Sequence, residues 1–230
     1  KLRDAHRFAV VELGMNNIGE ISYLSKIANP SVCLITNVGV AHIGNLGSKR
    51  AIAHAKTEIF EGMQECGTAI VNHDDEFASL HRSSVKRAKI VDFGFSKNAV
   101  FSATFDLIED GSSVAIEGPN KRFSLRLKVP GVHNVRNALA AVAACSSLDI
   151  PSETVKKGLE SFVGIQGRMQ IIKLSDGTKL IDDTYNASPE SMEEALKVLA
   201  RMSGRKIFVM GDMGELGVET LSSHRNIGFL

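Results

Sequence analysis

The chain has 230 residues, of which 43% are hydrophobic and 23% charged, a composition typical of globular protein with one core and part of another. Its 27 basic and 26 acidic residues give a net charge of +1, which excludes a global field favouring nucleic acid or an anionic membrane. Cys33, Cys66 and Cys145 lie far apart within apolar runs, so we expect buried thiols in a reducing compartment and no disulfide or zinc framework. With no signal-peptide pattern and no apolar run of about 18 residues, we expect a cytoplasmic protein without membrane insertion.

Short β-branched apolar runs alternate with longer helical patterns through the first part of the chain. Strands are expected at 8–12, 32–37 and 68–72, and helices at 18–28 and 48–63. This alternation predicts an α/β fold with a doubly wound, mostly parallel sheet. Residues 102–129 differ, because alternating runs around Asp110-Gly111 predict an antiparallel β insertion in this sheet.

The second half of the chain begins with two helical patterns, which are followed by a break rich in glycine. The expected elements are helices at 134–148 and 151–162, a hairpin at 169–183, a helix at 189–202, a strand at 206–210 and a helix from about Ser222. The elements after the break predict part of a second, Rossmann-like α/β domain. We therefore expect two domains, 1–166 and 167–230, both incomplete.

Polar residues that directly follow an apolar run are the first candidates for a site, because open α/β sheets bind ligands at the carboxyl ends of their strands. Glu12 ends the first expected strand, and His42 follows the second. A carboxylate and an imidazole at neighbouring strand ends can hold a divalent cation. A capping glutamate and a hydrogen-bonded histidine explain the same spacing, and this alternative stays open.

Three further candidates lie on expected helices. Lys56 lies beside the apolar stripe of its helix, and on the residues alone it is a solvated lysine. Asn134 and Asn137 are three residues apart at a helix start, so their amides share a face that can bind the edge of a base. A simple helix cap by Asn134 is the alternative.

Two polar segments belong to the second expected domain. The segment Asp182-Asp-Thr-Tyr-Asn186 places two adjacent acids at the end of an expected strand. Paired acids in this position can bind ribose hydroxyls or a metal ion, and turn formation is the alternative. Gly211-Asp-Met-Gly-Glu-Leu-Gly217 is only superficially similar to a phosphate loop, because it lacks both the Gly-Lys-Ser/Thr ending and the G-x-G-x-x-G spacing. No Walker sequence occurs anywhere in the chain.

Taken in this order, the segments resemble the Mur ligase family over essentially the whole chain. The resemblance is carried by Glu12-Leu-Gly-Met-Asn16 with Gly19-Glu-Ile21, residues 36–42, Ala55-Lys-Thr-Glu-Ile-Phe60, His133-Asn-Val-Arg-Asn137, and the two segments at 182–186 and 211–217. The last two favour the branch of the family that adds D-alanyl-D-alanine to UDP-N-acetylmuramoyl-tripeptide.

The resemblance implies an ATP-dependent carboxylate-amine ligase that uses ATP and Mg²⁺ and proceeds through an acyl phosphate. The implied metal ligands are Glu12, His42 and Lys56, with Lys56 carbamylated and, like His42, catalytic. The implied nucleotide-binding residues are Asn134 and Asn137 at the adenine and Arg168 and Asp183 at the phosphates and ribose, while Tyr185 and Asn186 lie near the amine acceptor.

The resemblance also implies a monomeric parent whose substrates are UDP-N-acetylmuramoyl-tripeptide and D-alanyl-D-alanine. The uridine-binding domain and the phosphate loop of the family have no counterpart in this sequence, so we expect the piece alone to be inactive. Residues 43–47 lack an acidic residue that is frequent in the family, and Ser188 replaces a common asparagine. A folate polyglutamate ligase and a non-catalytic nucleotide-binding module stay open as alternatives.

Overall fold

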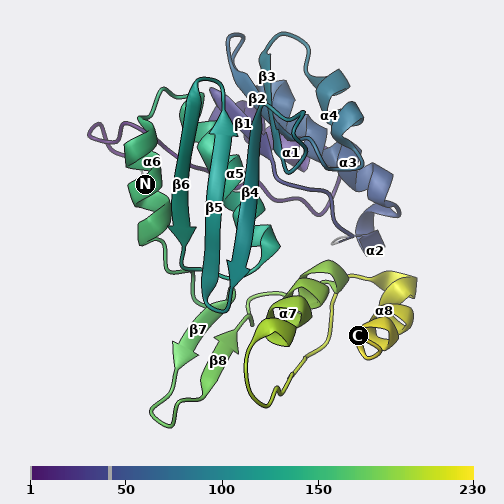
Figure 1. The fold of residues 1–230 in the computed structure, drawn as a ribbon. Helices are drawn as coiled ribbons and strands as arrows, with labels where there is room; N and C mark the ends of the chain where they lie inside the picture. Colours follow the sequence, from purple (N-terminus) through teal and green to yellow (C-terminus); the bar gives the residue numbers. More distant parts are fainter. Residues whose placement is uncertain (1, 41–42) are drawn as a thin grey trace.

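The computed structural model describes residues 2–40 and 43–230 and contains a six-stranded sheet followed by a two-stranded hairpin (Figure 1). The strands of the large sheet are β1 (Val32–Ile35), β2 (Thr68–Asn72), β3 (Lys89–Gly94), β4 (Phe101–Ile108), β5 (Gly111–Gly118) and β6 (Lys121–Leu127), adjacent in chain order. β1 to β4 run parallel, whereas β4 to β6 form an antiparallel meander. The predicted α/β fold with a mostly parallel sheet and an antiparallel part is therefore confirmed.

Alternation of side chains along the parallel strands explains why helices cover both faces of the sheet. Cys33 and Ile35 of β1 pack with Phe60 on one face, whereas Leu34 packs with Leu139 on the other. The first face carries α1 (Glu20–Ala28), α2 (Ile43–Leu46), α3 (Lys49–Thr57), the 3₁₀ helix η1 (Glu58–Gly62) and α4 (Ala78–Ser84), and the second carries α5 (Val132–Ser146) and α6 (Ser152–Ser161). Burial on both faces explains why every residue of β2 is buried.

The second unit contains the hairpin of β7 (Gln170–Lys173) and β8 (Lys179–Asp182), as predicted. α7 (Pro189–Arg201) begins with a capping box, in which Ser188 and Ser191 each accept the other's backbone N–H through the side-chain oxygen. The 3₁₀ helix η2 (Gly217–Glu219) leads into α8 (Thr220–Ile227). The small core of this unit, which includes Met213 and Leu216, also packs against Val40 of the first unit.

Two predicted strands, 8–12 and 206–210, are wrong. Neither segment is a strand or pairs with any described strand, and Val10 and Val209 are 100% and 87% exposed. An apolar pattern marks a face that can be buried, but a strand forms only where a neighbour completes its backbone hydrogen bonds.

The three cysteines are all free. Cys33 is buried and Cys145 half-buried, but the prediction of a buried thiol is wrong for Cys66, which is exposed in the turn before β2. Among the described residues, no helix combines the length and the apolar character needed to cross a membrane.

Candidate functional site

Lys56 lies in the last turn of α3 and is half-buried, not solvated as the residues alone suggest. Its helix is held in place by buried Ile52 and Ala55. Burial lowers the pKa of Lys56 below its ordinary value, and the negative charge of Asp75 offsets part of this effect. A lysine in this environment holds more of its amine in the neutral, nucleophilic form at neutral pH.

Asp75 connects Lys56 to the loop that follows β1. Its Oδ2 accepts the backbone N–H of Val38 at 2.8 Å. Three residues before Asp75, at the end of β2, Asn72 Nδ2 donates to the carbonyl of Thr36 at 2.9 Å. Both residues hold the loop that leads from β1 towards residue 42.

Asp75 is not among the predicted site residues. It follows the apolar run of residues 68–72 closely, so the same search for polar residues after a strand identifies it.

The two predicted metal ligands at the start of the chain are not brought together by any described contact. Glu12 lies outside helices and strands, and its exposed side chain has no partner among the described residues. His42 lies outside the described residues. The described part of the chain also holds no ready-made cluster of three or more His, Cys, Asp or Glu side chains for a metal.

The donor chemistry nevertheless fits Mg²⁺, which prefers oxygen ligands. The Glu12 carboxylate is such a donor and is not engaged elsewhere in the described chain. The amine of Lys56 is not an oxygen ligand, so Lys56 fits a magnesium site only as its carbamate.

Three predicted site residues of the second unit lie together at the junction of the two units. The guanidinium of Arg168 lies 4.1 Å from the ring centroid of Tyr185, and the Tyr185 N–H donates to the Gly167 carbonyl at 3.0 Å. Asp183 Oδ1 accepts the N–H of Met169 at 3.0 Å. Gly167 has φ 75°, a left-handed conformation that suits glycine and allows this close return of the chain.

Asp183 also faces the start of α5. Burial raises the pKa of this carboxyl, while the Met169 N–H and the charges of His133 and Arg168 act in the opposite direction. Burial in turn lowers the pKa of His133, against the effect of Glu194 and Asp183. Asp183 therefore lies close enough to His133, at the start of α5, for their charges to interact.

Asn134 and Asn137 lie on the first two turns of α5, as the pattern predicts. The N-cap residue is Gly131, so the alternative of a simple cap by Asn134 is wrong; Asn134 Nδ2 instead donates to the Pro130 carbonyl at 2.7 Å. Asn137 is exposed. Asn186 is exposed as well, and its Oδ1 accepts the N–H of the next residue at 2.9 Å.

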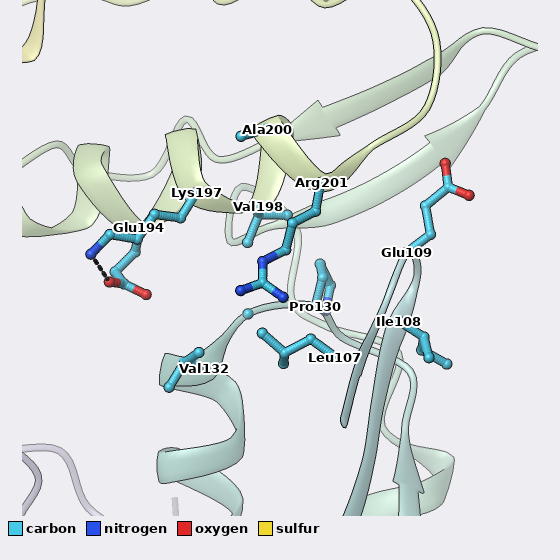
Figure 2. A pocket seen from close by; sticks show the side chains of 11 residues that line it. Leu107, Ile108, Glu109, Pro130, Val132, Glu194, Lys197, Val198, Ala200 and Arg201 are labelled. Atoms are coloured by element: carbon cyan, nitrogen blue, oxygen red, sulfur yellow. Dashed lines mark hydrogen bonds and ion pairs between the residues drawn. The ribbon is translucent and has the colours of Figure 1, made fainter. Parts of the chain in front are cut away.

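A cavity of about 490 Å³ lies between the end of β4, the start of α5 and α7 (Figure 2). Its walls are mostly apolar, and the side chain of Arg201 points into it. At its rim Glu109 accepts hydrogen bonds from Lys179 Nζ at 2.7 Å and Ser203 Oγ at 2.9 Å, which tie the meander to the second unit. None of the predicted site residues lines this cavity, so it belongs to the joint between the units.

Comparison with known families finds two consecutive matches along the chain. Residues 1–145 match the Mur ligase middle domain, and residues 167–229 match the Mur ligase glutamate ligase domain. One match lies in each unit of the structure, and residues 146–166, which include α6, fall between them.

Several similar proteins are ligases that act with D-alanyl-D-alanine. The UDP-N-acetylmuramoyl-tripeptide–D-alanyl-D-alanine ligase of Buchnera aphidicola is 39% identical over 99% of this chain and 50% of its own length. A crystal structure of MurF from Acinetobacter baumannii has a TM-score of 0.94 at 40% identity, over 99% of this chain and 50% of its own. MurF from Thermotoga maritima, solved in complex with ADP, has a TM-score of 0.83 at 27% identity, over 93% of this chain and 49% of its own. This chain thus spans about half the length of the relatives it matches.

Proposed function

Because this chain belongs to the Mur ligase family, we propose that the whole protein is an ATP-dependent ligase that adds D-alanyl-D-alanine to UDP-N-acetylmuramoyl-tripeptide. The observation that carries the proposal is the 39% identity along 99% of the chain to a ligase of that name. Residues 1–166 are assigned to the central ATPase domain and 167–230 to part of the C-terminal domain, which the two family matches support.

The proposed reaction has two steps. The tripeptide carboxylate attacks the γ-phosphorus of ATP, which gives an acyl phosphate and ADP. The amine of D-alanyl-D-alanine then attacks the acyl carbon, so that an amide forms and phosphate leaves. Bound Mg²⁺ offsets the repulsion between the carboxylate and the phosphate groups.

Glu12, His42 and Lys56 are the proposed magnesium ligands. The ammonium of Lys56 first loses a proton; the neutral amine then adds to CO₂ and loses a second proton, which gives an anionic carbamate. The half-buried position of Lys56 beside Asp75 supports this role, because a desolvated amine is more readily neutral and reactive.

The nucleotide is assigned to the junction of the two units. Asn134 and Asn137 face the adenine, Asp183 the ribose and Arg168 the phosphates. The electrostatic proximity of Asp183 to Arg168 and to the start of α5 supports a single site built from both units. Tyr185 and Asn186 are assigned to the acceptor end, next to these residues in the chain, and Tyr185 stacks with Arg168.

The proposal is tested with the whole protein encoded by the gene. Purified enzyme with ATP, Mg²⁺ and the UDP-linked tripeptide is expected to release phosphate with D-alanyl-D-alanine and not with glutamate as acceptor. Turnover with a folate as the carboxylate donor and glutamate as acceptor supports the folate-type alternative, and the absence of turnover with either pair of substrates supports the non-catalytic module.

The role of Lys56 has a matched control on the same helix. Lys56→Ala is expected to abolish turnover and to regain part of it with added short carboxylic acids, which supply the missing anion. Lys49→Ala removes a lysine that pairs at the surface with Glu76 and should leave turnover unchanged. Full activity of the Lys56 variant without added acid contradicts the assignment.

A further inference from the structure

The loop after β1 is held by the second unit on both sides of residue 42. Before it, the N–H of Val40 donates to Glu190 Oε1 at 3.0 Å, from a helix 150 residues away in sequence. After it, the N–H of Gly44 donates to the carbonyl of Glu215 at 3.0 Å. His42 lies between these two anchored residues in the sequence.

Glu190 contacts the loop after β1, and α7 does not need this residue as a cap. α7 is already capped by Ser188, and a glutamate in a first helical turn interacts equally well with the helix dipole when it is exposed. Here the carboxylate is turned against the loop: Oε2 is buried without a partner among the described residues. A Cβ added at Gly39 would lie 3.8 Å from both carboxylate oxygens, so the carboxylate packs on the loop backbone.

The contact at Gly44 is equally close. A Cβ at this position would lie 2.7 Å from the Glu215 carbonyl oxygen, so only glycine allows the two backbones to approach. Glu215 itself adopts φ 62°, a left-handed conformation that costs a non-glycine residue energy. The glycine-rich segment 211–217, which is no phosphate loop, thus serves as a docking surface for Val40 and Gly44.

We propose that Glu190 is a positioning residue that couples the placement of the second domain to the loop carrying His42. When the second domain is in place, Glu190 and Glu215 fix the backbone on either side of His42. When the second domain moves away, the backbone N–H groups of Val40 and Gly44 lose these partners. The consequence for metal binding rests on the proposed function, whereas the coupling of domain and loop does not.

Amide hydrogen exchange in the 230-residue chain tests the coupling directly. Glu190→Ala is expected to speed exchange of the Val40 amide by about tenfold or more, the effect of losing one charged hydrogen bond. Glu190→Gln keeps an acceptor oxygen and should show a smaller effect. Glu193→Ala, on the same helix, removes only a surface contact to Lys197 and should change nothing. Equal Val40 exchange in the Glu190→Ala and Glu193→Ala variants overturns the coupling.

The whole protein tests the consequence for the site. Glu190→Ala is expected to raise the Mg²⁺ concentration for half-maximal turnover at least about fivefold, with a smaller change in the KM for D-alanyl-D-alanine. An unchanged Mg²⁺ dependence in an active enzyme overturns the positioning role alone. An inactive wild-type protein overturns the proposed function, while the exchange result still decides the coupling. Gly44→Ala, which forces Gly44 and Glu215 apart, should shift the Mg²⁺ dependence in the same direction.

Discussion

Glu58 supports a helix to which it does not belong, so its replacement by alanine is expected to destabilise the first domain. Its carboxylate accepts the N–H of Gly19 at 2.8 and 3.0 Å and the N–H of Ser22 at 3.2 Å. These groups lie at the start of α1, whose N-cap residue Gly19 has no side chain to cap it. Glu58 is only 9% exposed, so in an alanine variant water can only poorly replace its carboxylate as the hydrogen-bond acceptor.

The cost follows from the contacts that are lost. Removal of a helix cap costs about 1 kcal/mol, and the loss of the negative charge together with two partly buried N–H groups left unpaired brings the total to about 2–4 kcal/mol. For a chain of this size the melting temperature should fall by about 5–15 °C. The melting temperature of Glu58→Gln should lie between those of the wild type and Glu58→Ala. The glutamine oxygen still accepts one of the hydrogen bonds, but the NH₂ group cannot accept the other.

Urea unfolding followed by circular dichroism measures the effect. Glu61 lies in the same 3₁₀ helix, but its contacts, with the Ser22 hydroxyl and Lys26, are exposed; in the ion pair with Lys26 the two side chains are 52% and 59% exposed. Glu61→Ala should therefore change the free energy of unfolding by less than about 1 kcal/mol. If Glu58→Ala unfolds at the same urea concentration as Glu61→Ala, the capping argument is wrong.

The remaining predictions concern packing, pH and activity. Gly62→Ala places a Cβ 2.1 Å from the carbonyl carbon of Ser25, so the free energy of unfolding in urea should fall by about 2–3 kcal/mol or more. Leu139→Ala empties a fully buried position and should cost about 2–5 kcal/mol in the same assay. Hydrogen bonds from Lys179 and Ser203 lower the pKa of Glu109 to about 2, so their contribution to stability is complete above the unfolded-state pKa of about 4.3 and is lost as pH falls towards 2. A carbon NMR titration should show that midpoint, and Lys179→Ala should move it upward. The 230-residue chain, which lacks a Walker sequence, should release no phosphate from ATP; release by a preparation free of contaminating ATPase contradicts this.

Local patterns predicted the elements whose partners are also local. The hairpins around Asp110-Gly111 and Asp176-Gly177 form as expected, because the turn and both strands lie within one short stretch. The run at 68–72 is a strand because two neighbours complete its hydrogen bonds. The runs at 8–12 and 206–210 carry the same kind of pattern but have no described partner, and their periodicity contains no information about one.

The same limit applies to the site. Residue type and position at the end of a predicted strand marked Glu12 as a candidate, but the contacts that shape the site join residues far apart in sequence. Glu190 reaches Val40 across 150 residues, and Glu58 reaches Gly19 across 39. No periodicity or short motif encodes such pairs, because each depends on how separate elements pack.

These contacts change how the motifs themselves are interpreted. Gly19 and Glu58 come from two motif segments that carry the family resemblance, and in the structure they form one structural contact, a carboxylate that caps a helix. Lys56 lies only two residues before Glu58, at the point where α3 passes into η1. The cap therefore also fixes the turn of helix from which Lys56 projects. Loss of activity after a change at Glu58 is evidence for chemistry only if the protein remains folded, whereas rescue of Lys56→Ala by a small carboxylate reports the chemistry itself.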